Sequence, residues 1–452
     1  MKKNLLTSAA LLFCMLSASL MPEVNAWSEH PLLTGPALKN HPVWATAAPV
    51  RATHLRTFLL ETETELELFL AQHEAWSRAN LPNYAPRPDA LAFKATGNPD
   101  DIVERFYRAI RINPHTKAPL YLHLLPGDDS LGRPRAHPAD LCTLTGLELM
   151  QFTHYVWLKD GEMVSPFDVL VTATDEPDYG LDLGLFADSN TPYGDVYGFG
   201  NQPFGNPKLE YSGQAPFHMA FYHEAGILYA AGPFLKRTWL DYRIFLFKAL
   251  AEFAFHKSQD YWGWRFAGWG MHYVGDISQP YHMKPLPGVS TARMIRINLQ
   301  SMMGAPKAVN NAVQLVSNRH AVMEVYQQLV SLEMHNGKNY EHPFYKALQN
   351  PAPLQPFSYD FILRTASGTS AAKGKATDKA LAKYIPHHMV SDPSVEVSTL
   401  VTELMNLMQE IEKEKGPDAV DALTQVIAGH LRDYSMHINS YLNDVIRVKE
   451  AH

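Results

Sequence analysis

The stretch "WGMHYVGDISQPYH" (269–282) most constrains what this chain can fold into, because it sets ionisable side chains inside an otherwise apolar helical pattern. His272 and Asp276 are four residues apart, so on a helix they share one face. Gln279-Pro280 then ends the helix and presents His282 from a new direction. The three side chains can therefore converge on a metal ion.

A second pair repeats this spacing further along the chain. In "NRHAVMEVY", His320 and Glu324 are again four residues apart. Imidazole nitrogen and carboxylate oxygen are ligands that zinc accepts. Two such pairs, with His282 between them, predict a site for more than one zinc ion.

The first 26 residues have the pattern of a secretory signal peptide. Lys2 and Lys3 precede a short apolar run, and Val24-Asn25-Ala26 supplies the small-residue cleavage site. Cleavage after Ala26 would make Trp27 the first residue. We therefore expect an exported protein, secreted or periplasmic, from a Gram-negative bacterium.

Composition limits the function classes of the mature chain. Removing 26 of 452 residues leaves 426, and losing Lys2, Lys3 and Glu23 moves the net charge from −7 to −8. This sign argues against a nucleic-acid partner. Only Cys142 remains after the leader, which carries Cys14, so no internal disulfide is possible. No later run is long and apolar enough to span a bilayer.

The periodicity of the remaining chain predicts a mostly α protein built on a single core, with long irregular loops around the site. Residues 366–382 ("ASGTSAAKGKATDKALA") are of low complexity, and we expect them to form an exposed, mobile loop. Helices are expected at 219–231, 234–256, 264–277, 309–334, 395–415 and 417–448.

These motifs resemble those of the bacterial zinc-dependent phospholipases C, which share a fold with the fungal zinc-dependent single-strand nucleases. The resemblance lies in an N-terminal Trp, in "HYVGDISQPYH", and in the H-x-x-x-[DE] pair that follows. It implies one catalytic domain over 27–452, with insertions at about 78–145, 283–312 and 366–395. The ligands that it implies directly are Trp27, His272, Asp276, His282, His320 and Glu324.

The resemblance implies three further ligands, and for each of them the sequence offers two candidate residues. An upstream His is His218, with His223 as the rival, and an upstream Asp is Asp175 rather than Asp178. The His of the first helix is His30 rather than His41. The resemblance then implies three zinc ions. Asp175, His218, His272 and Asp276 would hold the first, His282, His320 and Glu324 the second, and Trp27, His30 and Asp276 the third.

The implied activity is hydrolysis of the glycerol-side phosphodiester bond of phospholipids by a zinc-activated water, with Asp175 as a general base. Phosphatidylcholine at a membrane surface would give diacylglycerol and phosphocholine. Tyr179, Tyr193, Tyr197, Phe199 and Glu29 are candidates for the choline site, and 283–312 for contact with lipid. The alternatives are a single-strand nuclease or phosphodiesterase of the same fold, and a non-enzymatic zinc-binding protein that interacts with a host.

Overall fold

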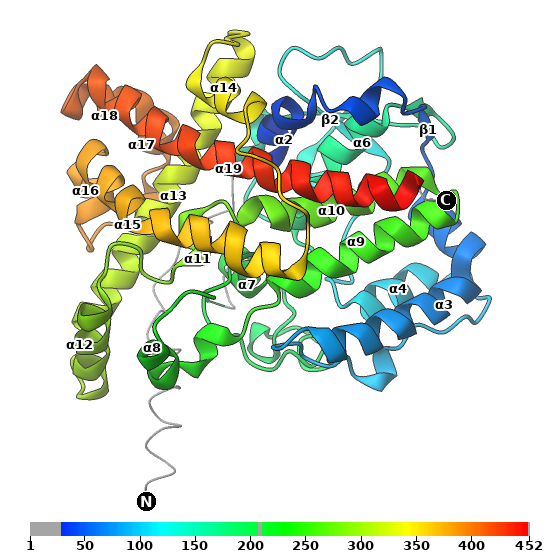
Figure 1. Cartoon of the computed structure of the whole chain (residues 1–452), viewed down its shortest axis with the longest axis horizontal. Coiled ribbons are helices and arrows are strands. Elements are labelled where there is room, and N and C mark those ends of the chain that lie inside the picture. The colour runs from blue at the N-terminus through cyan, green and yellow to red at the C-terminus, as the bar shows by residue number, and fades with distance from the viewer. Residues whose placement is uncertain (1–28, 148, 207–209, 451–452) are drawn as a thin grey trace, which may run out of the picture.

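The computed structural model describes residues 29–147, 149–206 and 210–450, and it is mostly helical, as predicted (Figure 1). Its first half contains α2 (His30–Leu38), α3 (Leu55–Asn80), α4 (Ile102–Ile110), α5 (Pro138–Leu141), α6 (Pro166–Ala173), α7 (Glu210–His218), α8 (Gly226–Ala231) and α9 (Leu240–His256). Its second half contains α10 (Asp260–Asp276), α11 (Pro280–Met283), α12 (Thr291–Met302), α13 (Lys307–Asn336), α14 (Pro343–Gln349), α15 (Ser367–Tyr384), α16 (His387–Ser391), α17 (Val401–Met405), α18 (Leu407–Lys415) and α19 (Pro417–Glu450).

Helix α10 is the centre of the main core. Every residue from Tyr261 to Asp276 is buried, because α9, α6 and α19 surround the helix. A helix with apolar residues on all sides is expected in such a position. Close approach depends on glycine at two points. A Cβ at Gly268 would lie 2.7 Å from the carbonyl oxygen of Leu170 on α6, and one at Gly275 would lie 2.5 Å from the ring of Tyr434 on α19.

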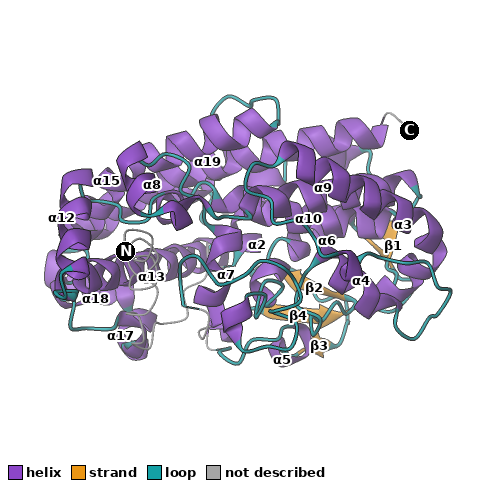
Figure 2. Cartoon of the chain, turned by 90° about the horizontal axis from the view of Figure 1, so that it is seen from below, coloured by secondary structure: helices purple, strands orange, loops and turns teal. Residues whose placement is uncertain are grey.

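The strands are short and lie at one side of the helical body (Figure 2). Strand β1 (Val50–Arg51) pairs antiparallel with β5 (Met163–Val164). A three-stranded antiparallel sheet has the order β2 (Tyr121–Leu124), β4 (His154–Trp157), β3 (Arg135–Ala136), and its register sets Tyr121 opposite Trp157. Within the described residues, no helix is long and apolar enough to cross a membrane.

The prediction of a mobile loop at 366–382 is wrong, because this segment forms most of α15. Its small residues, among them Ser370 and Gly374, are buried and let α15 pack closely against α11 and α19. Lys373 extends this contact by donating from Nζ to the carbonyl oxygen of Gly429 at 3.0 Å. Alanine and lysine also favour helix, so the composition that suggests low complexity suits a tightly packed helix equally well.

Two buried histidines of α19 face this interface. Thr377 of α15 lies 2.9 Å from Nε2 of His430, and the ring of His437 meets that of Phe361 edge-on. Both ring nitrogens of His437 are buried without a hydrogen-bond partner. Burial lowers the pKa of each histidine to about 3, with a smaller contribution from Lys373.

Leucine in place of His437 is expected to flatten the dependence of stability on pH. An unfolded histidine binds a proton near pH 6.5, whereas folded His437 does so only near pH 3, so stability falls as the pH falls between these values. Up to about 1.4 kcal/mol per pH unit of this slope belongs to His437. Thermal unfolding between pH 7 and pH 5 measures it, with exposed His54→Leu as the control. An identical slope in His437→Leu and the wild type would contradict this expectation.

Candidate metal centre

The end of α10 supplies the first two candidate ligands. His272 and Asp276 are both fully buried, and His272 Nε2 lies 3.4 Å from Asp276 Oδ2. Nδ1 of His272 donates to the carbonyl oxygen of Thr174 at 2.8 Å. This hydrogen bond fixes the tautomer in which Nε2 carries the lone pair, as in most metal-binding histidines.

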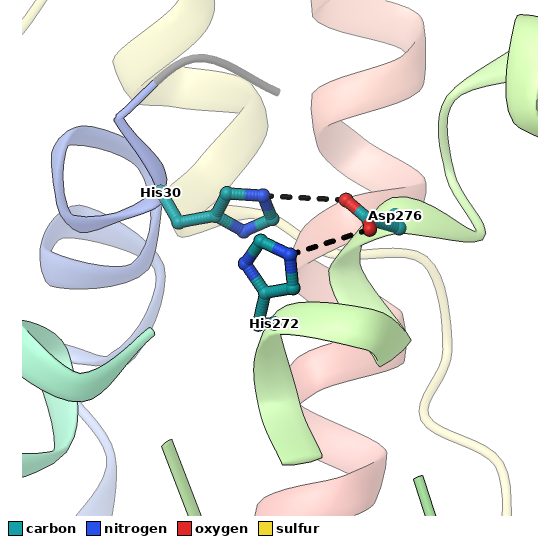
Figure 3. A group of neighbouring side chains, drawn as sticks. All are labelled: His30, His272 and Asp276. Atoms are coloured by element: carbon teal, nitrogen blue, oxygen red, sulfur yellow. Dashed lines mark ion pairs between the residues drawn. The ribbon is translucent and has the colours of Figure 1, made fainter. Parts of the chain in front are cut away.

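His30 joins this pair from the first turn of α2 (Figure 3). Its Nε2 lies 3.3 Å from Asp276 Oδ1, and its ring centroid lies 4.1 Å from that of His272. The alternative His41 lies elsewhere, with its Nδ1 accepting from the backbone of Val43 and its Nε2 beside Asn443. The structure therefore brings His30 rather than His41 into the group with His272 and Asp276.

A second group forms around His218, the last residue of α7. His218 Nδ1 lies 3.1 Å from His272 Nε2 and 3.0 Å from Asp276 Oδ2. Asp178 Oδ1 lies 3.6 Å from the same nitrogen of His272. Asp178, His218 and His272 can thus offer three ligand atoms to one ion. The rival His223 instead pairs with Ser367 at 2.8 Å.

The structure groups Asp178, and not the predicted Asp175, with His218 and His272. The role of Asp175 as a general base stays a prediction. Oδ1 of Asp175 accepts from the backbone N–H of His30 at 2.9 Å, and Oδ2 accepts from the hydroxyl of Tyr179 at 2.7 Å. Asp175 immediately precedes a 3₁₀ turn at Glu176–Tyr179, and Asp178 lies within this turn. Residues three apart lie on the same side of such a turn, so both carboxylates approach the site and the sequence alone could not separate them.

The third group lies between α11 and α13. His320 Nε2 lies 2.6 Å from Glu324 Oε1, and His282 Nε2 lies 3.9 Å from the same oxygen. The rings of His282 and His320 meet edge-on at 5.1 Å. His282, His320 and Glu324 are all buried and form the group that their spacing predicted. His282 Nδ1 also lies 3.9 Å from Asp276 Oδ2, which connects this group to the other two.

Buried polar atoms that have no hydrogen-bond partner support a role in binding metal. Each such atom costs about 1–3 kcal/mol unless something compensates it, and the centre gathers several of them. They are His30 Nε2, His218 Nε2, Asp276 Oδ1, both ring nitrogens of His282, His320 Nε2 and both carboxylate oxygens of Glu324. Cations would satisfy these atoms together, so the three buried groups fit metal ions.

The electrostatics of the centre agree with this interpretation. Burial lowers the pKa of His282 to about 4, which keeps its ring neutral and leaves one ring nitrogen free to bind a metal. Burial and the nearby charges of Asp178 and Asp276 raise the pKa of Glu324 well above its usual range. Burial alone would lower the pKa of His218, but Asp182 and Asp276 raise it to about 10. Cations would let these groups bind in their deprotonated forms.

Asp182 and Arg243 are residues beside the candidate centre that sequence reasoning missed. Asp182 Oδ2 lies 3.4 Å from His218 Nε2 and accepts from the hydroxyl of Tyr273 at 2.6 Å. Arg243 is fully buried and donates from Nε to Asp182 Oδ1 at 2.8 Å. A carboxylate behind a histidine orients the ring toward a metal. The available sequence signal was an arginine inside the apolar pattern of α9.

Several predicted residues do not reach the centre or cannot be placed. Trp27 and the signal peptide lie outside the described residues, so the terminal amine and carbonyl stay a prediction. Tyr197 and Phe199 are 1 % and 2 % exposed and pack in the main core, so they form no open choline site. Glu29 is buried, accepts from Gln328 at 3.1 Å, and has its pKa raised to about 8 chiefly by burial.

Comparisons of the chain with protein-family models, with curated proteins and with solved structures found no match.

Replacing Asp178 by Asn is expected to weaken zinc binding more than replacing Asp175 by Asn. Asp178 belongs to a ligand group, whereas both oxygens of Asp175 accept hydrogen bonds from the chain. We expect Asp178→Asn to lose one ion or to bind it about a hundredfold less tightly. Zinc content and chelator competition measure this. Equal losses in the two variants would return Asp175 to the ligand set.

Asp182→Asn is expected to lower zinc affinity by about tenfold to a hundredfold, because it removes the carboxylate that orients His218. Asp241→Asn is the matched control, since Asp241 is also buried but accepts from Tyr359 at 3.3 Å instead of contacting a ligand group. Chelator competition and thermal unfolding without zinc separate affinity from folding. The role of Asp182 would be refuted by unchanged affinity in a folded variant.

Proposed function

We propose that this protein is an exported zinc-dependent phospholipase C that cleaves the glycerol-side phosphodiester bond of phospholipids. The observation that carries the proposal is the convergence of three buried groups around Asp276, whose carboxylate lies within 3.9 Å of four histidines. These are the residue types, spacings and order that produced the family resemblance. In the predicted ligand set we propose Asp178 in place of Asp175.

Zinc is the metal that this donor set favours. All described ligand candidates offer imidazole nitrogen or carboxylate oxygen, and no cysteine takes part. A mixed set of this kind suits zinc, whereas calcium and magnesium prefer oxygen alone. We propose three ions, one for each group, with the amine and carbonyl of Trp27 completing the group of His30 once the signal peptide is removed.

The residues of the chain would bind the ions and orient the ligands. Asp276 would hold two ions, because its two oxygens face different histidines, Oδ1 toward His30 and Oδ2 toward His218. Thr174 and Asp182 would keep the rings of His272 and His218 in their binding orientations. When bound, zinc would activate a water toward phosphorus and offset the charge that develops on the phosphoryl oxygens.

Phosphocholine release from phosphatidylcholine vesicles, by protein beginning at Trp27, tests the proposal. A zinc chelator is expected to abolish release, and His282→Ala and His30→Ala to reduce it by about a hundredfold or more, because each loses a ligand. His41→Ala is the matched control and should retain release, since His41 lies outside the ligand groups.

The outcome that would overturn the proposal is the absence of release by a protein that holds its zinc. Single-stranded DNA and other phosphodiesters would then be assayed, because a nuclease of the same fold is the alternative enzyme. Zinc binding without hydrolysis of either substrate class would indicate a structural metal centre.

A further inference from the structure

Helix α12 has two unlike faces. Its inner face buries Met294 and Ile297, which join Leu228 of α8 and Val309 of α13 in a small apolar cluster separate from the main core. Its outer face exposes Arg293 and Arg296 in the first half. The second half and the turn that follows expose Leu299, Met302 and Met303, at 52 %, 55 % and 77 %. The outer face is thus cationic at one end and apolar at the other.

The apolar end is distinctive within the described part of the chain. Leu299, Met302 and Met303 fall within five consecutive positions, and elsewhere among the described residues exposed large hydrophobic side chains are spaced further apart. Scattered single exposures are ordinary on a protein surface, whereas a group of them needs an explanation. The helix stands at one end of the molecule, away from the main body of helices (Figure 1).

The charge of this segment is opposite to that of the protein. The chain has a net charge of −7, yet residues 277–323 contain no acidic residue. They carry the five cations Lys284, Arg293, Arg296, Lys307 and Arg319. Lys284 pairs with Glu224 and Arg319 with Asp378, while the other three pair with no carboxylate among the described residues. The unpaired cations all lie on or beside α12.

We propose that the outer face of α12, defined by Arg293, Arg296, Leu299, Met302 and Met303, docks on the surface of a bilayer that contains anionic phospholipid. The leucine and methionines enter the boundary between head groups and acyl chains, and the arginines pair with lipid phosphates. A helix with apolar and basic residues binds interfaces in this way.

The position of α12 links docking to the metal centre. The helix lies in the chain between α11, which carries His282, and α13, which carries His320 and Glu324. Docking through α12 would therefore anchor the protein by the segment that connects the two elements of the third ligand group. This inference rests on the proposed function for the identity of the substrate, but binding to lipid can be measured without hydrolysis.

Flotation with vesicles tests docking. The protein is mixed with vesicles of phosphatidylcholine alone or with phosphatidylserine added, and the bound fraction is measured. Arg293→Gln with Arg296→Gln is expected to weaken binding to the anionic vesicles by about thirtyfold, because each arginine near such a surface contributes about fivefold. The triple variant Leu299→Ser, Met302→Ser and Met303→Ser is expected to weaken binding to both vesicle types by about tenfold or more.

The matched control removes three exposed hydrophobic side chains that lie outside α12. Leu68, Leu131 and Met163 are 61 %, 69 % and 58 % exposed and lie on other elements, so their replacement by Ser should leave flotation unchanged. Equal losses in both triple variants, or equal binding by the α12 triple variant and the wild type, would overturn the proposal. So would a wild-type dimer that the α12 triple variant converts to a monomer, because a second copy would then cover the face.

A second measurement separates this proposal from the proposed function. Hydrolysis of a monomeric short-chain phosphatidylcholine needs the metal centre but no docking, so the α12 triple variant should retain it while losing hydrolysis of vesicles. If the wild type hydrolyses neither substrate yet floats with anionic vesicles in an α12-dependent manner, docking stands and the phospholipase proposal fails. If vesicles are hydrolysed equally well with and without the apolar residues of α12, the phospholipase proposal stands and docking through α12 fails.

Discussion

The contacts of the buried Asp276 carboxylate are the interaction on which the candidate metal centre depends. Its oxygens lie within 3.9 Å of four histidines that come from α2, α7, α10 and α11. A carboxylate in a dry interior is costly unless it is paired. Here those histidines hold the pKa of Asp276 well below its usual range, although burial alone would raise it. One side chain thus joins three ligand groups.

The sequence predicted the parts of the centre that depend on helical periodicity. The pairs His272 with Asp276 and His320 with Glu324 lie where i, i+4 spacing puts them, and the all-apolar pattern around them became the central helix. Asp178 could not be separated from Asp175, because a 3₁₀ turn brings both carboxylates to the same region. Asp182 escaped notice because its partner Arg243 is 61 positions away in the chain.

The helices show the same difference between what local sequence predicts and what contacts between distant residues decide. Long helices such as α10, α13 and α19 were predicted close to their observed positions. Helix α15 was missed because its stability comes from contacts that its own composition does not display. Asp378 shows this, since it accepts from Arg319 of α13 and from the hydroxyl of Tyr281 of α11, whose ring stacks on His320. The segment that was expected to be a mobile loop thus positions Tyr281, which packs against the candidate ligand His320.

The contact between Tyr434 and the first helix sets the order in which the centre can be assembled. The hydroxyl of Tyr434 lies 2.7 Å from the hydroxyl of Thr34 and 3.3 Å from Nδ1 of His30, residues that are 400 and 404 positions away in the chain. His30 therefore has its final support only after α19 has been synthesised and has packed against α2. Any metal site that uses His30 would consequently depend on both ends of the chain, and a chain that stops before α19 would lack this support.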